Sequence, residues 1–120
     1  MIELAKRAVA CKGWRWWPGM LDTEGRRMLA QGKLSWQPMS DPGTPPLPDL
    51  SDPATVGCLL FLVREAVGDP GAAVWRAKIM PGEPEYWEVS DCPAVLPRTF
   101  YGCGNTEAGA LIFALEGASA

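Results

Sequence analysis

The chain has 120 residues, of which 48% are hydrophobic and 21% are charged, and its formal net charge is −3. A chain of this length folds as one domain whose core needs neither a metal ion nor a disulfide. The acidic balance argues against non-specific binding to nucleic acid, and no apolar run approaches the roughly 18 residues that cross a bilayer. Because the first residues also lack a signal-peptide pattern, we expect a cytoplasmic protein without membrane contact.

The charges are unevenly distributed along the sequence. Residues 1–36 carry seven basic and three acidic side chains, whereas residues 37–120 carry four basic and eleven acidic ones. Whether the folded surface is equally uneven depends on how these two parts pack together.

The first 30 residues predict a helix followed by a hairpin. Apolar residues spaced three or four apart indicate an amphipathic helix over 2–12, which Gly13 would end in a left-handed conformation. The aromatic-rich segment 14–21 and the segment 26–30 then predict two strands joined by a turn at 22–25. Because Pro18 cannot donate a backbone hydrogen bond, the first of these strands should lie at a sheet edge.

The middle of the chain combines a proline-rich loop with a helix. Six prolines fall between residues 37 and 53, so we expect a surface loop over 37–52. Asp52 and Pro53 are typical of a helix start, and Gly68 is typical of a helix end. The sequence therefore predicts a helix over 53–67. Only a narrow strip of this helix is polar, made of Thr55, Arg64 and Glu65, so we expect other elements to cover most of its sides and the helix to be central to the packing.

The last third predicts a second hairpin and a closing helix. Alternation places Trp75 and Ala77 on one side of a strand over 73–80, with Arg76 and Lys78 on the other. In the return strand over 86–90, Trp87 and Val89 should face the core and Glu88 should face outward, opposite Arg76 or Lys78.

The region 91–104 contains prolines and glycines and predicts a loop with a short extended piece at 99–101. Asn105 or Thr106 should then cap a final helix that ends near Gly117. The predicted fold is α+β: one layered domain over residues 1–120, with order α-β-β-α-β-β-α and antiparallel hairpins packed against helices.

Two stretches, 10–20 (ACKGWRWWPGM) and 47–66 (LPDLSDPATVGCLLFLVREA), resemble small proteins of tailed phages and prophages. The last part, a hairpin followed by Asn105-Thr-Glu-Ala and an alanine-rich helix, is similar to the phage ABA sandwich domain. It is more loosely similar to the antitoxin fold of the HicB type, although an extra helix interrupts the strands here. The resemblance implies a phage-borne α/β layered domain, and it assigns no catalytic residue because those phage proteins have no assigned activity.

Candidate chemistry is scarce in this sequence. The chain has no histidine, and its four cysteines, Cys11, Cys58, Cys92 and Cys103, include no Cys-x-x-Cys pair, so we expect reduced thiols rather than a zinc site. A cysteine or serine nucleophile would lack its usual imidazole base.

The carboxylates of Glu83, Glu85, Glu88 and Asp91 cluster in or beside the hairpin, where charge normally favours solubility. Gly102 and Gly104 alone do not define a phosphate-binding loop. We therefore predict no catalytic residue, no cofactor and no metal site.

Arg15, Trp17, Arg26 and Arg27 form the main candidate surface for a ligand or partner. Aromatic faces that alternate with guanidinium groups suit single-stranded nucleic acid or a nucleotide, whose bases stack and whose phosphates attract cations. The competing interpretation is structural: Trp14 and Trp16 would face the core, and the arginines would merely flank them.

The leading functional hypothesis is a non-enzymatic phage accessory protein that binds a host or phage protein in the host cytoplasm, such as a component of a defence system. The alternative is nucleic-acid or nucleotide binding through the Trp/Arg-rich hairpin. The sequence leaves the partner's identity and the oligomeric state open.

Overall fold

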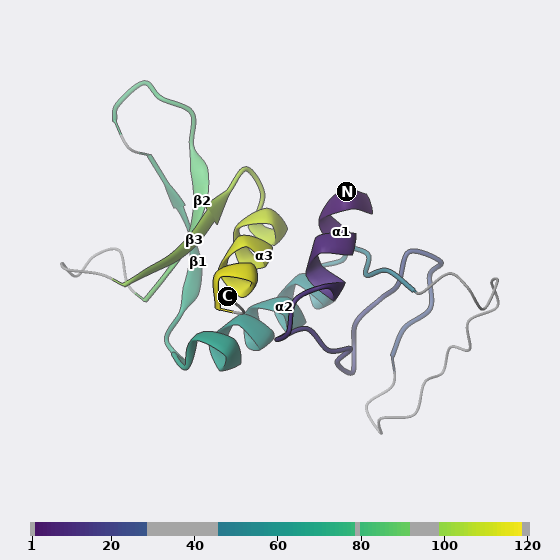
Figure 1. Cartoon of the computed structure of the whole chain (residues 1–120). Helices are drawn as coiled ribbons and strands as arrows, with labels where there is room; N and C mark the ends of the chain where they lie inside the picture. Colours follow the sequence, from purple (N-terminus) through teal and green to yellow (C-terminus); the bar gives the residue numbers. More distant parts are fainter. Residues whose placement is uncertain (1, 29–45, 79, 92–98, 119–120) are drawn as a thin grey trace.

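A computed structural model describes residues 2–28, 46–78, 80–91 and 99–118 of the chain (Figure 1). The elements, in chain order, are α1 (Ile2–Val9), α2 (Pro53–Val67), β1 (Ala73–Ala77), β2 (Tyr86–Ser90), β3 (Phe100–Gly104) and α3 (Glu107–Ala118). The strands form one antiparallel sheet in the order β1-β2-β3. The predicted α+β class is therefore confirmed, whereas the predicted element order differs in detail.

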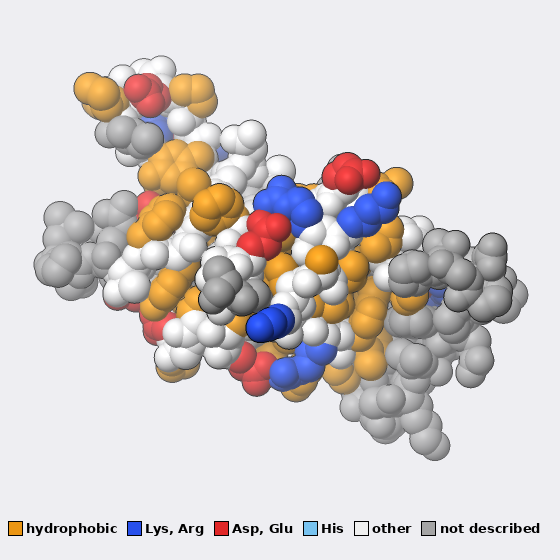
Figure 2. Space-filling model, viewed as in Figure 1, with side chains coloured by type: hydrophobic (Ala, Val, Ile, Leu, Met, Phe, Trp, Pro, Cys, Tyr) orange, Lys and Arg blue, Asp and Glu red, His pale blue; other side chains and the backbone are white. Residues whose placement is uncertain are grey.

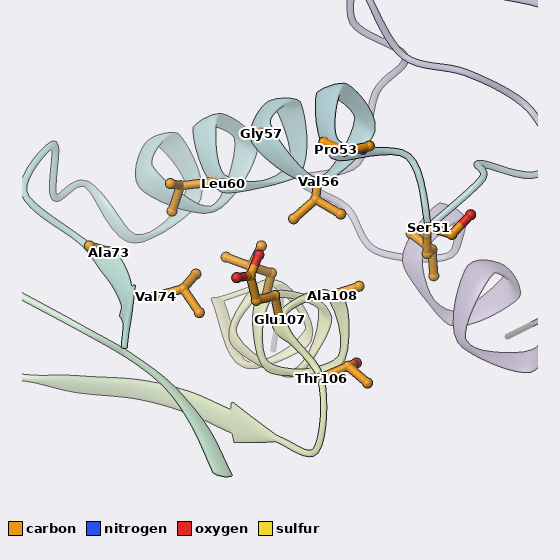
Figure 3. A pocket seen from close by; sticks show the side chains of 12 residues that line it. Ser51, Pro53, Val56, Gly57, Leu60, Ala73, Val74, Thr106, Glu107 and Ala108 are labelled. Atoms are coloured by element: carbon orange, nitrogen blue, oxygen red, sulfur yellow. The ribbon is translucent and has the colours of Figure 1, made fainter. Parts of the chain in front are cut away.

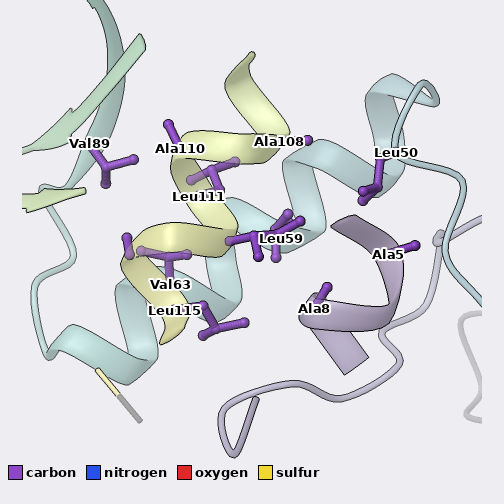
Figure 4. Close-up of a cluster of buried hydrophobic side chains, with 12 residues drawn as sticks. Ala5, Ala8, Leu50, Leu59, Val63, Val89, Ala108, Ala110, Leu111 and Leu115 are labelled. Atoms are coloured by element: carbon purple, nitrogen blue, oxygen red, sulfur yellow. The ribbon is translucent and has the colours of Figure 1, made fainter. Parts of the chain in front are cut away.

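The helix α3 lies in the middle of the molecule, between the sheet on one side and α1 and α2 on the other (Figures 1 and 4). Its buried residues point to both sides: Ala108, Ala110, Leu111, Ile112, Ala114 and Leu115. The sequence predicts that the helix over 53–67 organises the packing. That helix exists with the predicted bounds, but α3 takes the central place because its small residues let neighbours approach from two sides.

The contact between α3 and β3 depends on two glycines. A Cβ atom added at Gly102 would lie 2.8 Å from the backbone nitrogen of Ala114, and one at Gly104 would lie 2.7 Å from that of Ala110. Real side chains do not approach a backbone that closely, so only glycine allows this helix to pack directly on this strand. The predicted loop over 91–104 is thus wrong in its last part, because these glycines serve packing rather than a turn.

Both ends of α2 match their sequence signals. The Asp52 side chain accepts a hydrogen bond from the Thr55 backbone at 3.0 Å, and Gly68 ends the helix in the left-handed conformation with φ +72°. Thr55, however, is buried rather than part of an exposed polar strip. Its hydroxyl accepts a hydrogen bond from the Leu21 backbone at 2.9 Å, which ties the N-terminal segment to the start of α2.

The β1–β2 hairpin is confirmed, and Trp87 and Val89 of β2 face the core as predicted, but the opposite face is covered at Glu88 as well. Val74 pairs with Val89 on the face toward α3, whereas Trp75 and Glu88 pair on the opposite face. Glu88 is fully buried there, with the Tyr86 hydroxyl 3.4 Å from its carboxylate. Alternation alone fixes which residues share a face, and it does not say which face is covered.

Arg76 of β1 and Lys78, which directly follows the strand, therefore have a different partner from the predicted one. Arg76 and Lys78 both pair with Glu85, at 2.9 and 3.7 Å, rather than with Glu88.

The N-terminal part contains less regular structure than predicted. The helix α1 already ends at Val9, and Gly13 is not left-handed; a Cβ there would instead lie 2.9 Å from the Leu115 side chain. Within residues 14–28, the predicted hairpin is reduced to isolated bridges that pair Leu21 with Arg27 and Asp22 with Pro48. The predicted strand residues 29–30 and loop residues 37–45 lie outside the described residues.

Candidate functional site

A cleft with a volume of about 570 Å³ opens where α2, β1 and α3 meet (Figure 3). Its walls include Val56, Gly57 and Leu60 of α2, Val74 of β1, and Glu107 and Leu111 of α3. Figure 3 shows the side chains of Val56, Leu60 and Val74 pointing into the space between these elements. The cleft thus presents mostly aliphatic groups, which favour the burial of an apolar side chain.

Small residues keep the cleft open. A Cβ added at Gly57 would meet no atom within 4 Å, although this glycine lies inside a helix. Ala73 and Ala108 line the adjoining walls. A glycine in a helix interior is less stable than alanine by about 0.5–1 kcal/mol. Its occurrence inside the predicted helix over 53–67 is therefore the sequence signal that could have pointed to this cleft.

Glu107 gives the cleft its charge. Its side chain extends from the first turn of α3 into the space between Val56 and Val74 (Figure 3). It is the one charged residue among the described residues that line the cleft, and within that part of the chain its carboxylate has neither an ion pair nor a hydrogen bond. Glu107 is exposed, and its place in the first turn of α3 suits the positive end of the helix dipole.

Arg15 and Trp17, two of the residues predicted to bind a ligand, pack along the middle of α2. The Arg15 guanidinium lies 4.9 Å from the Trp17 ring centroid and forms an ion pair with Glu65. The Trp17 ring lies 4.7 Å from that of Phe61. This cluster joins the N-terminal segment to α2 through stacking and charge.

The other two predicted residues lie closer to the start of α2. Arg26 pairs with Asp22 at 2.8 Å and with Glu24 at 2.6 Å, and Asp22 is fully buried. Arg27 donates hydrogen bonds to Asp52 at 3.2 Å and to the Gly19 carbonyl at 2.6 Å. The structure therefore brings Arg15 and Trp17 together beside α2 and places Arg27 against the N-cap residue Asp52, nine residues before Phe61.

Basic and acidic side chains are intermixed on the surface seen in Figure 2. Arg7 pairs with Glu116 at 2.6 Å, and this hydrogen-bonded partner lowers the pKa of Glu116 and raises that of Arg7. The uneven distribution of charge in the sequence is thus largely balanced where the two parts meet.

Thiol and carboxylate chemistry has no assembled centre among the described residues. No group of three or more potential metal ligands occurs there. Cys11, Cys58 and Cys103 are free thiols, and burial raises the pKa of Cys11 and Cys58, which keeps both protonated at neutral pH. Cys92 lies outside the described residues.

No model of a protein family, no curated protein and no solved structure matches this chain. In the part of the chain that the structure describes, no helix has the length and apolar character needed to span a bilayer.

Proposed function

We propose that this chain is a non-enzymatic binding protein that holds an apolar segment of a partner protein in the α2–β1–α3 cleft. The observation that carries the proposal is an open aliphatic cleft whose single charge, on Glu107, has no partner in the described chain. The resemblance to small phage proteins favours an accessory role, in which the partner is a host protein such as a defence component.

The cleft suits recognition better than chemistry. One buried side chain the size of leucine stabilises a complex by about 1.5–3 kcal/mol, and association itself costs more than that. The partner must therefore make further contacts around the cleft. Catalysis by a pair of ionisable groups would need a second such group beside Glu107, and none lines the described walls.

Gly57 allows the cleft to be blocked without disturbing the core. In Gly57→Gln the new side chain would occupy open space at the cleft, whereas Gly57→Ala adds only one methyl group. We expect the wild-type protein and Gly57→Ala to capture the same stoichiometric partner from bacterial lysate. With that partner purified, Gly57→Gln should bind at least about tenfold more weakly while its melting temperature stays at or above that of the wild type.

The comparison of these two variants separates specific capture from adventitious capture. A partner that Gly57→Gln binds as tightly as the wild type does would exclude the cleft as its binding site. Recovery of no stoichiometric partner by the folded protein would count against the proposed function as a whole.

The alternative, nucleic-acid or nucleotide binding through Arg15, Trp17, Arg26 and Arg27, has less support. Each of the three guanidinium groups lies against a carboxylate of the same chain, so a phosphate would have to displace Glu65, Asp22 or Asp52.

A further inference from the structure

In the described part of the chain, the strand β1 has one edge that no other strand covers. The sheet order β1-β2-β3 gives β1 a partner on one side, and among the described residues no strand or bridge pairs with its other side. Its first two residues, Ala73 and Val74, line the cleft. The open edge and the cleft are therefore parts of one continuous surface.

Contacts within the chain limit strand pairing at both ends of this edge. The Arg64 side chain donates a hydrogen bond to the Ala72 carbonyl at 2.7 Å, just before β1 begins. At the other end, Arg76 and Lys78 carry charges, which oppose uncontrolled pairing of exposed strand edges. The free backbone groups are thus confined to the short stretch that adjoins the cleft.

We propose that the partner segment binds as an added strand along the free edge of β1, with an apolar side chain in the cleft and a basic side chain two residues away facing Glu107. This inference rests on the proposed function and specifies which kind of segment occupies the cleft. Residues two apart on a strand share a face and lie about 7 Å apart, so one extended segment can present both groups to the same cleft.

Charge complementarity selects the basic residue. The exposed side chain of Glu107 extends between Val56 and Val74 at a mostly aliphatic cleft and has no ion pair among the described residues, so a lysine or arginine of the partner can pair with it (Figure 3). A bound helix would leave the backbone groups on the free edge of β1 unpaired. An added strand would form hydrogen bonds with these backbone groups and would also place a side chain in the cleft.

Two pools of acetylated, amidated heptapeptides test the proposal with the full chain. Both pools have a large apolar residue at the third position; one has lysine or arginine at the fifth position, and the other has aspartate or glutamate there. We expect the basic pool to be retained about tenfold better than the acidic pool, and Glu107→Gln to remove that preference. Gly57→Gln should release the peptides, and Gly57→Ala should not.

Methylation of single backbone nitrogens in the best-bound peptide tests the strand itself. An added strand should lose about tenfold in affinity at alternate positions and little at the positions between them. Equal sensitivity at all positions, or no preference between the pools, would overturn the added strand. If a lysate partner nevertheless depends on Gly57 in those cases, the proposed function stands and only the strand model fails.

Discussion

Glycine residues determine how closely neighbouring elements approach one another in this fold. Gly102 and Gly104 bring β3 against the backbone of α3, whereas Gly57 leaves space beside α2. The same residue type therefore has opposite structural roles, and the same substitution should have opposite effects at these positions.

Gly104→Ala should destabilise the protein by about 2 kcal/mol or more, because its methyl group would push α3 away from the sheet. Gly57→Ala should stabilise it by about 0.5–1 kcal/mol, because alanine favours the helix and meets no neighbour. Urea denaturation of both variants measures the two free energies of unfolding. A neutral Gly104→Ala would mean that β3 and α3 are not in direct backbone contact.

Asp52 should make stability depend on acid pH. The hydrogen-bonded Arg27 guanidinium, together with Thr55, lowers the pKa of Asp52 below its ordinary value of 3.8. A carboxylate with a lower pKa in the folded state stabilises the fold above its unfolded pKa, and that contribution disappears as the pH falls from about 5 toward 2. Asp52→Asn keeps a capping oxygen but removes the charge, so its stability should fall less over this range. Equal pH profiles for the wild type and Asp52→Asn would contradict this role.

At the scale of elements, one hydroxyl group fixes the N-terminal segment at the first turn of α2. The Thr55 hydroxyl accepts a hydrogen bond from the Leu21 backbone and donates one to Asp52 at 2.9 Å. It thus holds the segment around Leu21 against the first turn of the helix.

Thr55→Val should cost about 1–3 kcal/mol, because it keeps the shape but leaves the Leu21 amide without its acceptor. Thr55→Ser, which retains the hydroxyl, should cost clearly less. Hydrogen exchange should also become faster at Leu21 in Thr55→Val than in Thr55→Ser. Equal exchange in the two variants would show that the segment is held by other contacts.

The elements with local signals are those that could be predicted from the sequence. The helix over 53–67 has its cap, its first-turn proline and its closing glycine within a few residues of its ends, and its bounds are confirmed. Only the start of the strand over 100–104 was predicted, as an extended piece at 99–101, because its glycines look like loop residues until α3 is packed against them. The core-facing side of β2, with Trp87 and Val89, is confirmed, whereas the burial of Glu88 on the other side depends on packing that alternation does not contain.

At the scale of the whole molecule, ion pairs join the basic beginning of the chain to its acidic remainder. Arg7 pairs with Glu116, Arg15 with Glu65, and Arg27 with Asp52. The candidate cleft could not be predicted for a related reason: its walls come from residues as distant in sequence as Leu50 and Leu111. Such juxtapositions exist only after folding.

The arginines should therefore matter for stability more than for nucleic acid. Arg26→Ala should destabilise the protein by about 2 kcal/mol or more, because it leaves the buried Asp22 carboxylate without its cation. At about 150 mM salt, a single-stranded oligonucleotide should bind the wild type no more tightly than about 10⁻⁴ M. Thermal denaturation and tryptophan fluorescence titration measure the two quantities. Micromolar, salt-sensitive binding that Arg26→Ala plus Arg27→Ala abolishes in a folded protein would instead favour the nucleic-acid alternative.

The packing of α1 against α3 has a consequence during synthesis on the ribosome. The apolar side chains of Ala5 and Ala8 are buried in a core that includes α3, yet α3 is made roughly 100 residues later. At typical translation rates that delay is on the order of 5 to 20 s. Residues 2–9 therefore cannot bury Ala5 and Ala8 against α3 until α3 has left the exit tunnel, and a chaperone that shields nascent chains should bind this segment.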